Sequence, residues 1–336
     1  MTVVGPFGLS VRDQALEADV QTGLAAVEAG LLDATKSEVP FITEAAQHLI
    51  RAGGKRFRPL IVMLAAQFGD PYAPGVVPSA VVVELTHLAT LYHDDVMDEA
   101  DVRRGVESAN ARWGNSVAVL TGDFLFARAS HILADLGPEA VRIQAEAFER
   151  LVTGQILETA GPRDGRDPVD HYLDVLSGKT GSLVAVSGRF GAMMSGAEES
   201  VVDILTQYGE RLGTAFQLAD DVLDIASDSH ESGKTPGTDL REGIPTLPVL
   251  HLRAQAAREN RPEDLELVAL LDGDLSDDAR HAEALRRLRV HPALEQARRD
   301  TVRYAEEARA TLAPLPSGYA KSALEELCDA VVHRAG

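Results

Sequence analysis

Two groups of three aspartates share one spacing, i, i+1 and i+4. They are Asp94, Asp95 and Asp98 in HDDVMDE, and Asp220, Asp221 and Asp224 in ADDVLDI. In a helix the first and last carboxylates of such a group lie about 5–6 Å apart and repel each other. Each group is expected late in a helix, where the macrodipole also disfavours anions. A bound divalent cation would remove both costs, and carboxylate ligands alone favour Mg²⁺ over zinc.

The cations that could hold a phosphate group are few and lie in glycine-rich or motif-flanking settings. They are Lys55 and Arg58 in GGKRFRP, Arg103 and Arg104 after the first trio, Lys179 in SGKTG and Lys234 in SGKTPG. Guanidinium groups bind phosphate bidentately and lysines act as point charges, so these residues are candidate diphosphate ligands. Neither lysine segment is a P-loop, because Leu173 and Asp228 replace its first glycine. ATP hydrolysis is therefore not supported.

The composition excludes several classes of partner. With 32 basic and 52 acidic residues the net charge is −20, so bulk charge does not favour nucleic acid or an anionic membrane. The single cysteine, Cys328, cannot form an intrachain disulfide, and the start MTVVGPFGLSVRDQALEADV lacks the features of a secretory signal. The longest apolar run, 60–66, is far shorter than the ~20 residues of a bilayer span. We expect a cytoplasmic protein without a membrane span or a nucleic-acid partner.

The elements that carry the two trios are expected to be helices. Apolar residues recur at helical spacing over 79–99, with Ser79 as a candidate N-cap, and over 200–225. Strand-like alternation beside hairpin dipeptides is absent. Turn-forming residues cluster at 69–78, 161–168, 227–248 and 314–318, and none of these segments is a long linker. The pattern predicts an all-α fold and one domain over 1–336, with the acidic stretch 262–283 as solvated surface.

Taken together, these segments resemble the trans-isoprenyl diphosphate synthases, or polyprenyl synthetases. The matching segments run in order as GGKRFRP (53–59), ELTHLATLYHDDVMDEADVRRG (84–105), GDFLFARA (122–129), KTG (179–181), FQLADDVLD (216–224) and GKTPGTDLREG (233–243). The core motifs thus span 53–243, and 292–334 resembles the last helices of the family. The resemblance implies a single large helical bundle around a deep central cavity, with the aspartate motifs facing each other across its mouth. It also implies a homodimer whose membrane contact, if any, is peripheral and through the product.

The resemblance further implies condensation of isopentenyl diphosphate with an allylic diphosphate. The six aspartates would hold several Mg²⁺ ions that bridge to the allylic diphosphate, which Arg103, Lys179 and Lys234 would also contact. Isopentenyl diphosphate would be bound by Lys55, Arg58, His87 and Arg104, with Thr180 and Gln217 between the substrates. Metal and cations would stabilise the leaving diphosphate, and water would have to be kept away from the allylic cation. The alkene then attacks that cation and a proton is lost.

Product length should depend on the helix that precedes the first trio. In the family, bulky aromatics four and five residues before the first aspartate stop elongation, and here these residues are Thr90 and Ala89. The cavity floor would then be formed by Ala89, Thr90, Thr86, Leu85 and Val82. We therefore expect a product longer than farnesyl and longer than geranylgeranyl, unless another helix supplies the floor. One departure is Ile244, where the family often has a lysine for the allylic diphosphate; Arg241 is the candidate to compensate.

Four alternatives stay open. The first is a short-chain synthase that makes farnesyl or geranylgeranyl diphosphate. A class I terpene cyclase is a second, although Lys55, Arg58 and Arg104 would then have no second diphosphate to bind. A non-catalytic partner subunit is a third, although its aspartate motifs should be eroded and both are complete here. The fourth is a calcium loop with Asp272, Asp274, Ser276 and Glu283 at positions 1, 3, 5 and 12, but position 6 is Asp277 and not glycine.

Overall fold

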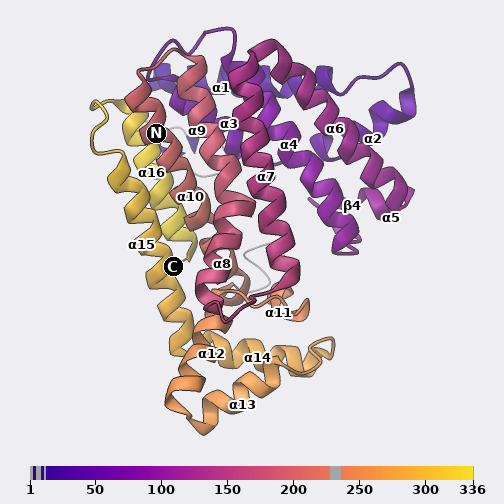
Figure 1. The fold of residues 1–336 in the computed structure, drawn as a ribbon, viewed down its shortest axis with the longest axis vertical. Coiled ribbons are helices and arrows are strands. Elements are labelled where there is room, and N and C mark those ends of the chain that lie inside the picture. The colour runs from indigo at the N-terminus through magenta and orange to yellow at the C-terminus, as the bar shows by residue number, and fades with distance from the viewer. Residues whose placement is uncertain (1–2, 5–8, 11–12, 228–235, 336) are drawn as a thin grey trace. The chain divides into compact units, whose positions relative to one another are not determined.

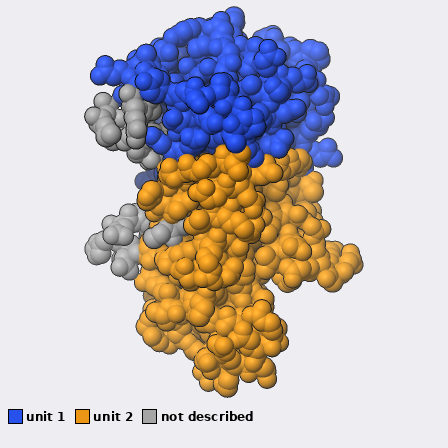
Figure 2. Space-filling view, turned by 90° about the vertical axis from the view of Figure 1, so that its left-hand side faces the viewer, with its two compact units in different colours: residues 1–149, 183–209, 311–326 blue, residues 150–182, 210–310, 327–336 orange. Residues whose placement is uncertain are grey.

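The computed structural model describes residues 3–4, 9–10, 13–227 and 236–335, and they are predominantly helical. The predicted all-α class is confirmed. The chain divides into two compact units, drawn in blue and orange in Figure 2. Unit 1 comprises residues 1–149, 183–209 and 311–326, and unit 2 comprises 150–182, 210–310 and 327–336. The helix bundle with a central cavity, and one domain over 1–336, stay predictions.

Unit 1 is built around helix α4. Its helices are α1 (Gln14–Ala34), α2 (Pro40–Arg51), α3 (Phe57–Ala66), α4 (Val76–Met97), α5 (Ala109–Trp113), α6 (Asn115–Leu136), α9 (Ser182–Met194, from residue 183) and the first parts of α7 (Pro138–Ala160), α10 (Glu199–Ala226) and α16 (Tyr319–Ala335). Helix α4 packs against α1, α3, α5 and α6 (Figure 1). Its Val81, Val82, Val83 and Leu85 are all buried, so neighbouring elements cover more than one side of this part of the helix.

Helix α4 begins earlier than the sequence predicts. Gly75 occupies the N-cap position, and the proposed cap Ser79 lies inside the helix, fully buried. The Ser79 hydroxyl donates to the carbonyl of Val76 at 2.8 Å, so it bonds within the helix and does not cap it. The buried side chain of Val76 continues the apolar pattern into this first turn. The prediction of Ser79 as N-cap was therefore wrong, whereas the helix itself is confirmed.

Two short hairpins were not predicted. Strands β1 (Val3–Val4) and β2 (Leu9–Ser10) pair, as do β3 (Val102–Arg103) and β4 (Val106–Glu107). The turn between β3 and β4 has Arg104 and Gly105 at φ 55° and 77°, the left-handed region that a type I′ hairpin turn requires. Strands of two residues are too short to produce an alternating pattern, which is why periodicity missed them.

Unit 2 holds the remaining helices. They are the later parts of α7, α10 and α16, with α8 (Pro168–Leu176), the π-helical turn η1 (Ser177–Gly181), α11 (Thr238–Arg241), α12 (Leu247–Glu259), α13 (Pro262–Leu271), α14 (Asp278–Arg289) and α15 (Pro292–Thr311, to residue 310). Helix α12 packs on α8 and α13, and α13 packs on α14 (Figure 1). The acidic stretch 262–283 is largely exposed, but Asp264 is buried and lies 3.0 Å from His291. A charge pattern alone does not reveal such a long-range partner.

Helix α6 has unusual composition for a surface helix. Among the described residues it is the one helix long and apolar enough to cross a membrane, and 33% of its most apolar window is buried. Its exposed apolar residues include Val119 and Leu120. A helix that is apolar in this way also suits a protein core or a protein interface, so length and composition alone are weak evidence for a membrane span.

Candidate active site

The first aspartate trio lies at the C-terminal end of α4. Asp94 and Asp95 are in the last turn, and Asp98 is the C-cap, whose N–H donates to the carbonyl of Asp94 at 2.8 Å. Asp95 is fully buried, whereas 48% of the Asp98 side chain is exposed. The helical spacing predicted for this trio is therefore present, but its members differ in their access to solvent.

Arg103, on β3, is the counter-ion of the buried carboxylate. Its Nε donates to Oδ1 of Asp95 at 2.5 Å, and its Nη2 lies 3.9 Å from Oδ2 of Asp98. The other oxygen of Asp95, Oδ2, is buried and accepts no hydrogen bond from the described residues. Burial raises the pKa of Asp95, and Arg103 opposes that shift. One oxygen of a buried carboxylate is thus left without a protein donor, which is where a cation could bind.

Arg104 points elsewhere. Its Nη1 donates to the carbonyl of Leu49 at 3.0 Å and to the carbonyl of Gly53. Helix α2 ends at Arg51, so the carbonyl of Leu49 is among those that the helix leaves without an internal partner. Adjacent arginines in one turn therefore serve different parts of the site, since Arg103 holds the aspartate motif and Arg104 holds the end of α2.

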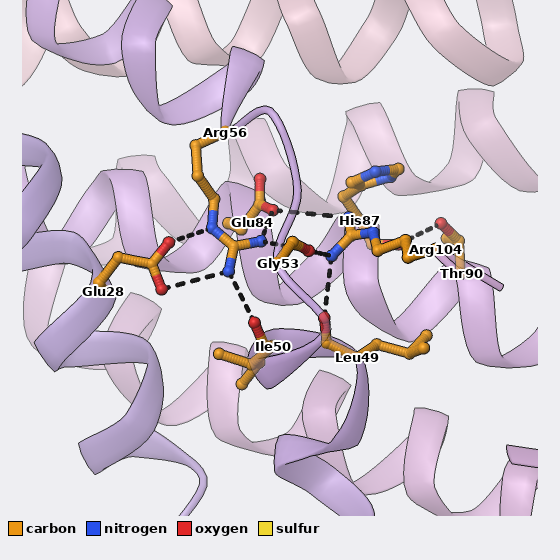
Figure 3. A network of polar contacts seen from close by, with 9 residues as sticks. All are labelled: Glu28, Leu49, Ile50, Gly53, Arg56, Glu84, His87, Thr90 and Arg104. Carbon is orange, nitrogen blue, oxygen red and sulfur yellow. Dashed lines mark hydrogen bonds and ion pairs between the residues drawn. The ribbon is translucent and has the colours of Figure 1, made fainter. Parts of the chain in front are cut away.

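The basic segment that follows α2 contains one arginine that sequence analysis did not assign. Arg56 is 9% exposed, and it bonds to Glu28 on α1 and to Glu84 on α4, at 3.0 Å from the latter (Figure 3). Its neighbour Lys55 is exposed. Arg56 is therefore an internal structural cation, although it lies between two predicted ligands of isopentenyl diphosphate.

Arg58 and His87 are both partly accessible and lie in a cationic neighbourhood. The Nε of Arg58 is buried and has no hydrogen-bond partner among the described residues. Burial lowers the pKa of Arg58 to about 10, with Arg104 contributing and Glu84 opposing. Burial also lowers the pKa of His87 well below its usual value, and Arg58 and Arg104 add to this effect. His87 is therefore a neutral imidazole that can donate one hydrogen bond.

The second aspartate trio lies near the C-terminal end of α10 and has partners from distant segments. Asp221 is 4% exposed and accepts from the hydroxyl of Tyr172 and, at 3.1 Å, from the amide of Gln217. Asp220 lies 2.6 Å from Nη2 of Arg334, whose guanidinium stacks over the Phe216 ring at 4.7 Å.

Asp224 is bound to the short helix α11. Its two carboxylate oxygens accept the backbone N–H groups of Thr238 and Asp239, each at 3.2 Å. Its carbonyl accepts the N–H of Gly237 at 2.8 Å. Asp224 therefore caps α11, a structural task that the motif spacing does not reveal.

Lys179 lies in the π-helical turn η1, a type of irregularity that is frequent at functional sites. Its Nζ is 2.6 Å from Oε2 of Glu158 on α7, and its side chain is 31% exposed. A Cβ on Gly154 would lie 2.7 Å from the backbone nitrogen of Lys179, so glycine at this position permits α7 and η1 to approach closely. The next residue, Thr180, donates to Oε1 of Gln217 at 3.4 Å. Lys234 lies outside the described residues.

The five predicted floor positions on α4 differ in burial. Val82, Leu85 and Ala89 are fully buried, and Thr86, 1% exposed, accepts a hydrogen bond from Gln144 on α7 at 2.8 Å. Thr90 is partly accessible, as are His87 and Asp94, which lie on the same side of the helix at helical spacing. Thr90 is thus the floor candidate that shares a face with the first aspartate trio.

Two further predictions about individual residues concern unit 2. Ile244 is 36% exposed. The proposed substitute cation, Arg241, is 2.9 Å from Asp278 and donates to the carbonyl of Ser276. In the described part of the chain no three His, Cys, Asp or Glu side chains converge on one point. The metal-binding role of each trio therefore stays a prediction.

The family model for polyprenyl synthetase matches residues 39–287. The chain belongs to the polyprenyl synthetase family. Nonaprenyl diphosphate synthase of Mycobacterium tuberculosis is 49% identical over 330 residues, which cover 98% of this chain and 97% of that protein. Octaprenyl diphosphate synthase of Escherichia coli is 34% identical over 316 residues, with 93% and 95% covered. The crystal structure of geranylgeranyl pyrophosphate synthase from Corynebacterium glutamicum, complexed with calcium and isoprenyl diphosphate, gives a TM-score of 0.86 at 45% identity, with 97% and 99% covered.

This polyprenyl synthetase is therefore the kind of enzyme that its motifs predict, a transferase of prenyl groups. The structure adds residues that hold the predicted ones and that sequence analysis did not assign. They are Glu28, Arg56, Glu84, Glu158, Tyr172 and Arg334. Arg56 and Glu84 lie inside the matched motifs, so their position was a signal for them. Arg334 ends the segment 292–334 that resembles the last helices of the family. Glu28, Glu158 and Tyr172 are distant in sequence from their partners and had no such signal.

Proposed function

We propose that this polyprenyl synthetase condenses isopentenyl diphosphate with an allylic diphosphate in a Mg²⁺-dependent reaction. The observation that carries the proposal is the buried Asp95 beside Arg103, one of whose oxygens accepts no hydrogen bond within the described part of the chain. A divalent metal suits this all-carboxylate environment. The Corynebacterium relative was crystallised with calcium, another hard divalent cation, and with isoprenyl diphosphate.

The residues that would hold Mg²⁺ are the six aspartates. They are Asp94, Asp95, Asp98, Asp220, Asp221 and Asp224. When bound, the metal supplies charge neutralisation of the diphosphate that leaves the allylic carbon. Tyr172 and Gln217 orient Asp221 by donating to its two oxygens, and Arg103 stabilises the ionised form of Asp95.

The chain's own cations would bind the two diphosphates. Arg103, Lys179 and Lys234 are assigned to the allylic diphosphate, and Lys55, Arg58, His87 and Arg104 to isopentenyl diphosphate. In the reaction the allylic carbon–oxygen bond breaks, the alkene of isopentenyl diphosphate forms the new carbon–carbon bond, and a proton leaves the adjacent carbon. The products are a diphosphate ester longer by one isoprene unit, inorganic diphosphate and that proton. Neutral His87 donates a hydrogen bond without adding charge.

The product is proposed to be longer than geranylgeranyl diphosphate. Neither Ala89 nor Thr90 has the bulk to stop a growing chain, and the relative with 49% identity is a nonaprenyl diphosphate synthase. The Corynebacterium relative is a geranylgeranyl pyrophosphate synthase, so product length needs a direct measurement. Replacing the partly accessible Thr90 by Phe should shorten the product. The same change at the fully buried Ala89 is expected to disturb packing first, because overfilling a core is destabilising.

A homodimer in the cytoplasm is the proposed working form. The exposed apolar residues Val119 and Leu120 on α6 favour burial against a second copy of the chain. The one cysteine, Cys328, is buried and needs no oxidising compartment. Sedimentation equilibrium of the wild type and of Leu120→Glu would test this assembly, with a dimer for the former and dissociation for the latter expected.

The experiment that tests the function uses purified protein, Mg²⁺, labelled isopentenyl diphosphate and separate allylic starters. We expect elongation beyond geranylgeranyl, and its loss when the metal is chelated. No elongation with any starter would overturn the proposal. Cyclised hydrocarbon from an allylic diphosphate alone would indicate a cyclase, and a product that stops at farnesyl or geranylgeranyl would indicate the short-chain alternative.

A further inference from the structure

A charged network in unit 1 contains two of the predicted isopentenyl diphosphate ligands, Arg58 and Arg104. Arg56 comes from the segment before α3, Arg104 from the β3–β4 turn, Glu28 from α1 and Glu84 from α4 (Figure 3). Arg58, in the first turn of α3, is linked to this network through the charge of Glu84. The network thus contains three guanidinium groups and two carboxylates, which gives it one positive charge in excess. The substrate that is expected here carries a diphosphate.

Glu84 lies at the centre of this network. It is 2% exposed, and its Oε1 is 3.0 Å from Nη1 of Arg56 and 4.0 Å from Nη2 of Arg104. Its negative charge also raises the pKa of Arg58, against the larger lowering effect of burial. One buried carboxylate therefore influences all three arginines, and a buried charge with several cationic partners restricts their positions more strongly than an exposed ion pair does.

Arg56 and Arg104 are engaged by the protein itself. Arg56 bonds to Glu28 and Glu84 and to the carbonyl of Ile50 at 3.1 Å. Arg104 bonds to the carbonyl of Leu49. Together the two arginines provide donors for two carbonyls at the end of α2. The carbonyl of Leu49 has no partner within the helix, and the carbonyl of Ile50 also accepts the N–H of Gly53 at 3.0 Å.

The turn after α2 is shaped by the same two arginines. The carbonyl of Gly53 accepts from both Arg56 and Arg104. A Cβ on Gly54 would lie 2.9 Å from Cζ of Arg104, so the backbone of this turn is pressed against the guanidinium group. The position of the turn, and with it the start of the segment that carries Arg58, therefore depends on where Glu84 holds these arginines.

Arg58 differs from both because its Nε is buried and has no hydrogen-bond partner among the described residues. We infer that Glu84 is the positioning residue of the isopentenyl diphosphate site: it fixes Arg56 as the frame and thereby sets the positions of Arg104 and Arg58, the two arginines assigned to the incoming diphosphate. This inference rests on the proposed function. Glu84 itself does not touch the substrate, so its effect should fall on substrate affinity and not on the chemical step.

The inference can be tested by comparing the KM for isopentenyl diphosphate with kcat and with the KM for the allylic substrate. Glu84→Gln keeps the shape of the side chain but removes the charge that holds Arg56 and Arg104. We expect the KM for isopentenyl diphosphate to rise about tenfold, since one charge-assisted contact is lost, while kcat and the KM for the allylic substrate change less than about twofold. A uniform loss of folded enzyme would instead lower the apparent kcat and leave both KM values unchanged.

Two further variants keep the inference testable if Glu84→Gln does not fold. Glu84→Asp retains the charge but shortens its reach to Arg56, and we expect a smaller rise, about threefold, in the same KM. The matched control is Glu44→Gln, which breaks the half-exposed ion pair with Arg112 at 2.6 Å and should leave all constants unchanged. Calorimetric titration of each folded variant with isopentenyl diphosphate alone checks that the change is in binding.

The outcomes separate this inference from the proposed function. If the wild type elongates an allylic starter but both Glu84 variants keep its KM for isopentenyl diphosphate, Glu84 is not a positioning residue. The same conclusion follows if both KM values rise equally, or if Glu84→Asp has the wild-type KM while Glu84→Gln fails to fold. If the wild type elongates nothing, the proposed function itself is wrong.

Discussion

The two aspartate trios have the same spacing and different surroundings. In unit 1 the buried Asp95 has a counter-ion, Arg103, that lies eight residues further along the chain. In unit 2 the partners of the second trio come from far away in sequence, with Tyr172 on α8 and Arg334 on α16. Two motifs of the same spacing therefore depend on local contacts in one case and on long-range contacts in the other.

The comparison also shows that the three aspartates of a trio are not equivalent. Asp98 is half-exposed at the end of α4, whereas its counterpart Asp224 gives both oxygens to backbone N–H groups of α11. A carboxylate oxygen has two acceptor directions, so a hydrogen bond does not prevent metal binding. It does mean that replacing Asp224 disturbs local structure as well as any ligand role.

The largest expected effect comes from removing one central carboxylate from each trio. Asp95→Asn and Asp221→Asn should each lower kcat by about 10³-fold, because charge stabilisation of the leaving diphosphate is the main catalytic term. Steady-state elongation assays at saturating Mg²⁺ measure this loss. The control is Asp101→Asn, an exposed residue just beyond the first trio, which should retain wild-type activity. A loss below tenfold for either variant would contradict a shared catalytic role for the two trios.

The next prediction separates the two counter-ions. Arg103→Gln should lower kcat/KM about 100-fold, because fully buried Asp95 then lacks compensation for its charge. Arg334→Gln should cost about threefold, because the side chain of Asp220 is 29% exposed and its charge is already partly solvated. Parallel assays of the two variants, with far-ultraviolet circular dichroism to confirm folding, make the comparison. Equal losses would show that burial does not distinguish the trios.

Much of this arrangement can be predicted from sequence, because helices and motif spacing are local. The helical period placed α4 and α10, and with them both trios, and the family motifs indicated the enzyme class. The β3–β4 hairpin escaped because two-residue strands carry no periodic signal. Its turn separates the partners of Arg103 from those of Arg104, two neighbours that the family resemblance assigns to different substrates.

Long-range partners set the limit of the sequence analysis. A sequence shows that Asp220 and Arg334 exist, but their contact depends on how α10 and α16 pack within unit 2. The same holds for Glu28, whose pairing with Arg56 joins α1 to the segment before α3. A charge pattern gives only the order of charged residues along the sequence, whereas ion pairs between helices depend on how the helices pack in three dimensions.

The cations near the first trio should also produce a pH-dependent stability. Burial, Arg58 and Arg104 hold the pKa of His87 well below 6.5, so the folded state binds fewer protons than the unfolded state when the pH falls below 6.5. Stability from this group is present above pH 6.5 and is lost as the pH falls toward the folded pKa, with a slope of up to about 1.4 kcal/mol per pH unit. Urea unfolding of wild type and His87→Gln at several pH values measures it.

For His87→Gln we expect a weaker acid dependence than for the wild type, since glutamine does not titrate. His131→Gln, at an exposed position on α6, is the matched control and should keep the wild-type dependence. Parallel curves for wild type and His87→Gln would mean that neither burial nor the neighbouring cations lower the pKa of His87.

The smallest expected effect is on the free energy of unfolding, measured without metal, when the last residue of each trio is replaced. Asp224→Asn should lower the free energy of unfolding by about 1 kcal/mol, because an amide nitrogen cannot accept one of the two N–H groups that the carboxylate binds at α11. Asp98→Asn, whose side chain is half-exposed, should change it by less than about 0.5 kcal/mol. Urea titration with chelator present measures both. Equal effects would mean that capping of α11 does not set the second trio apart, whereas the expected difference would show that this trio supports the fold even when no metal is bound.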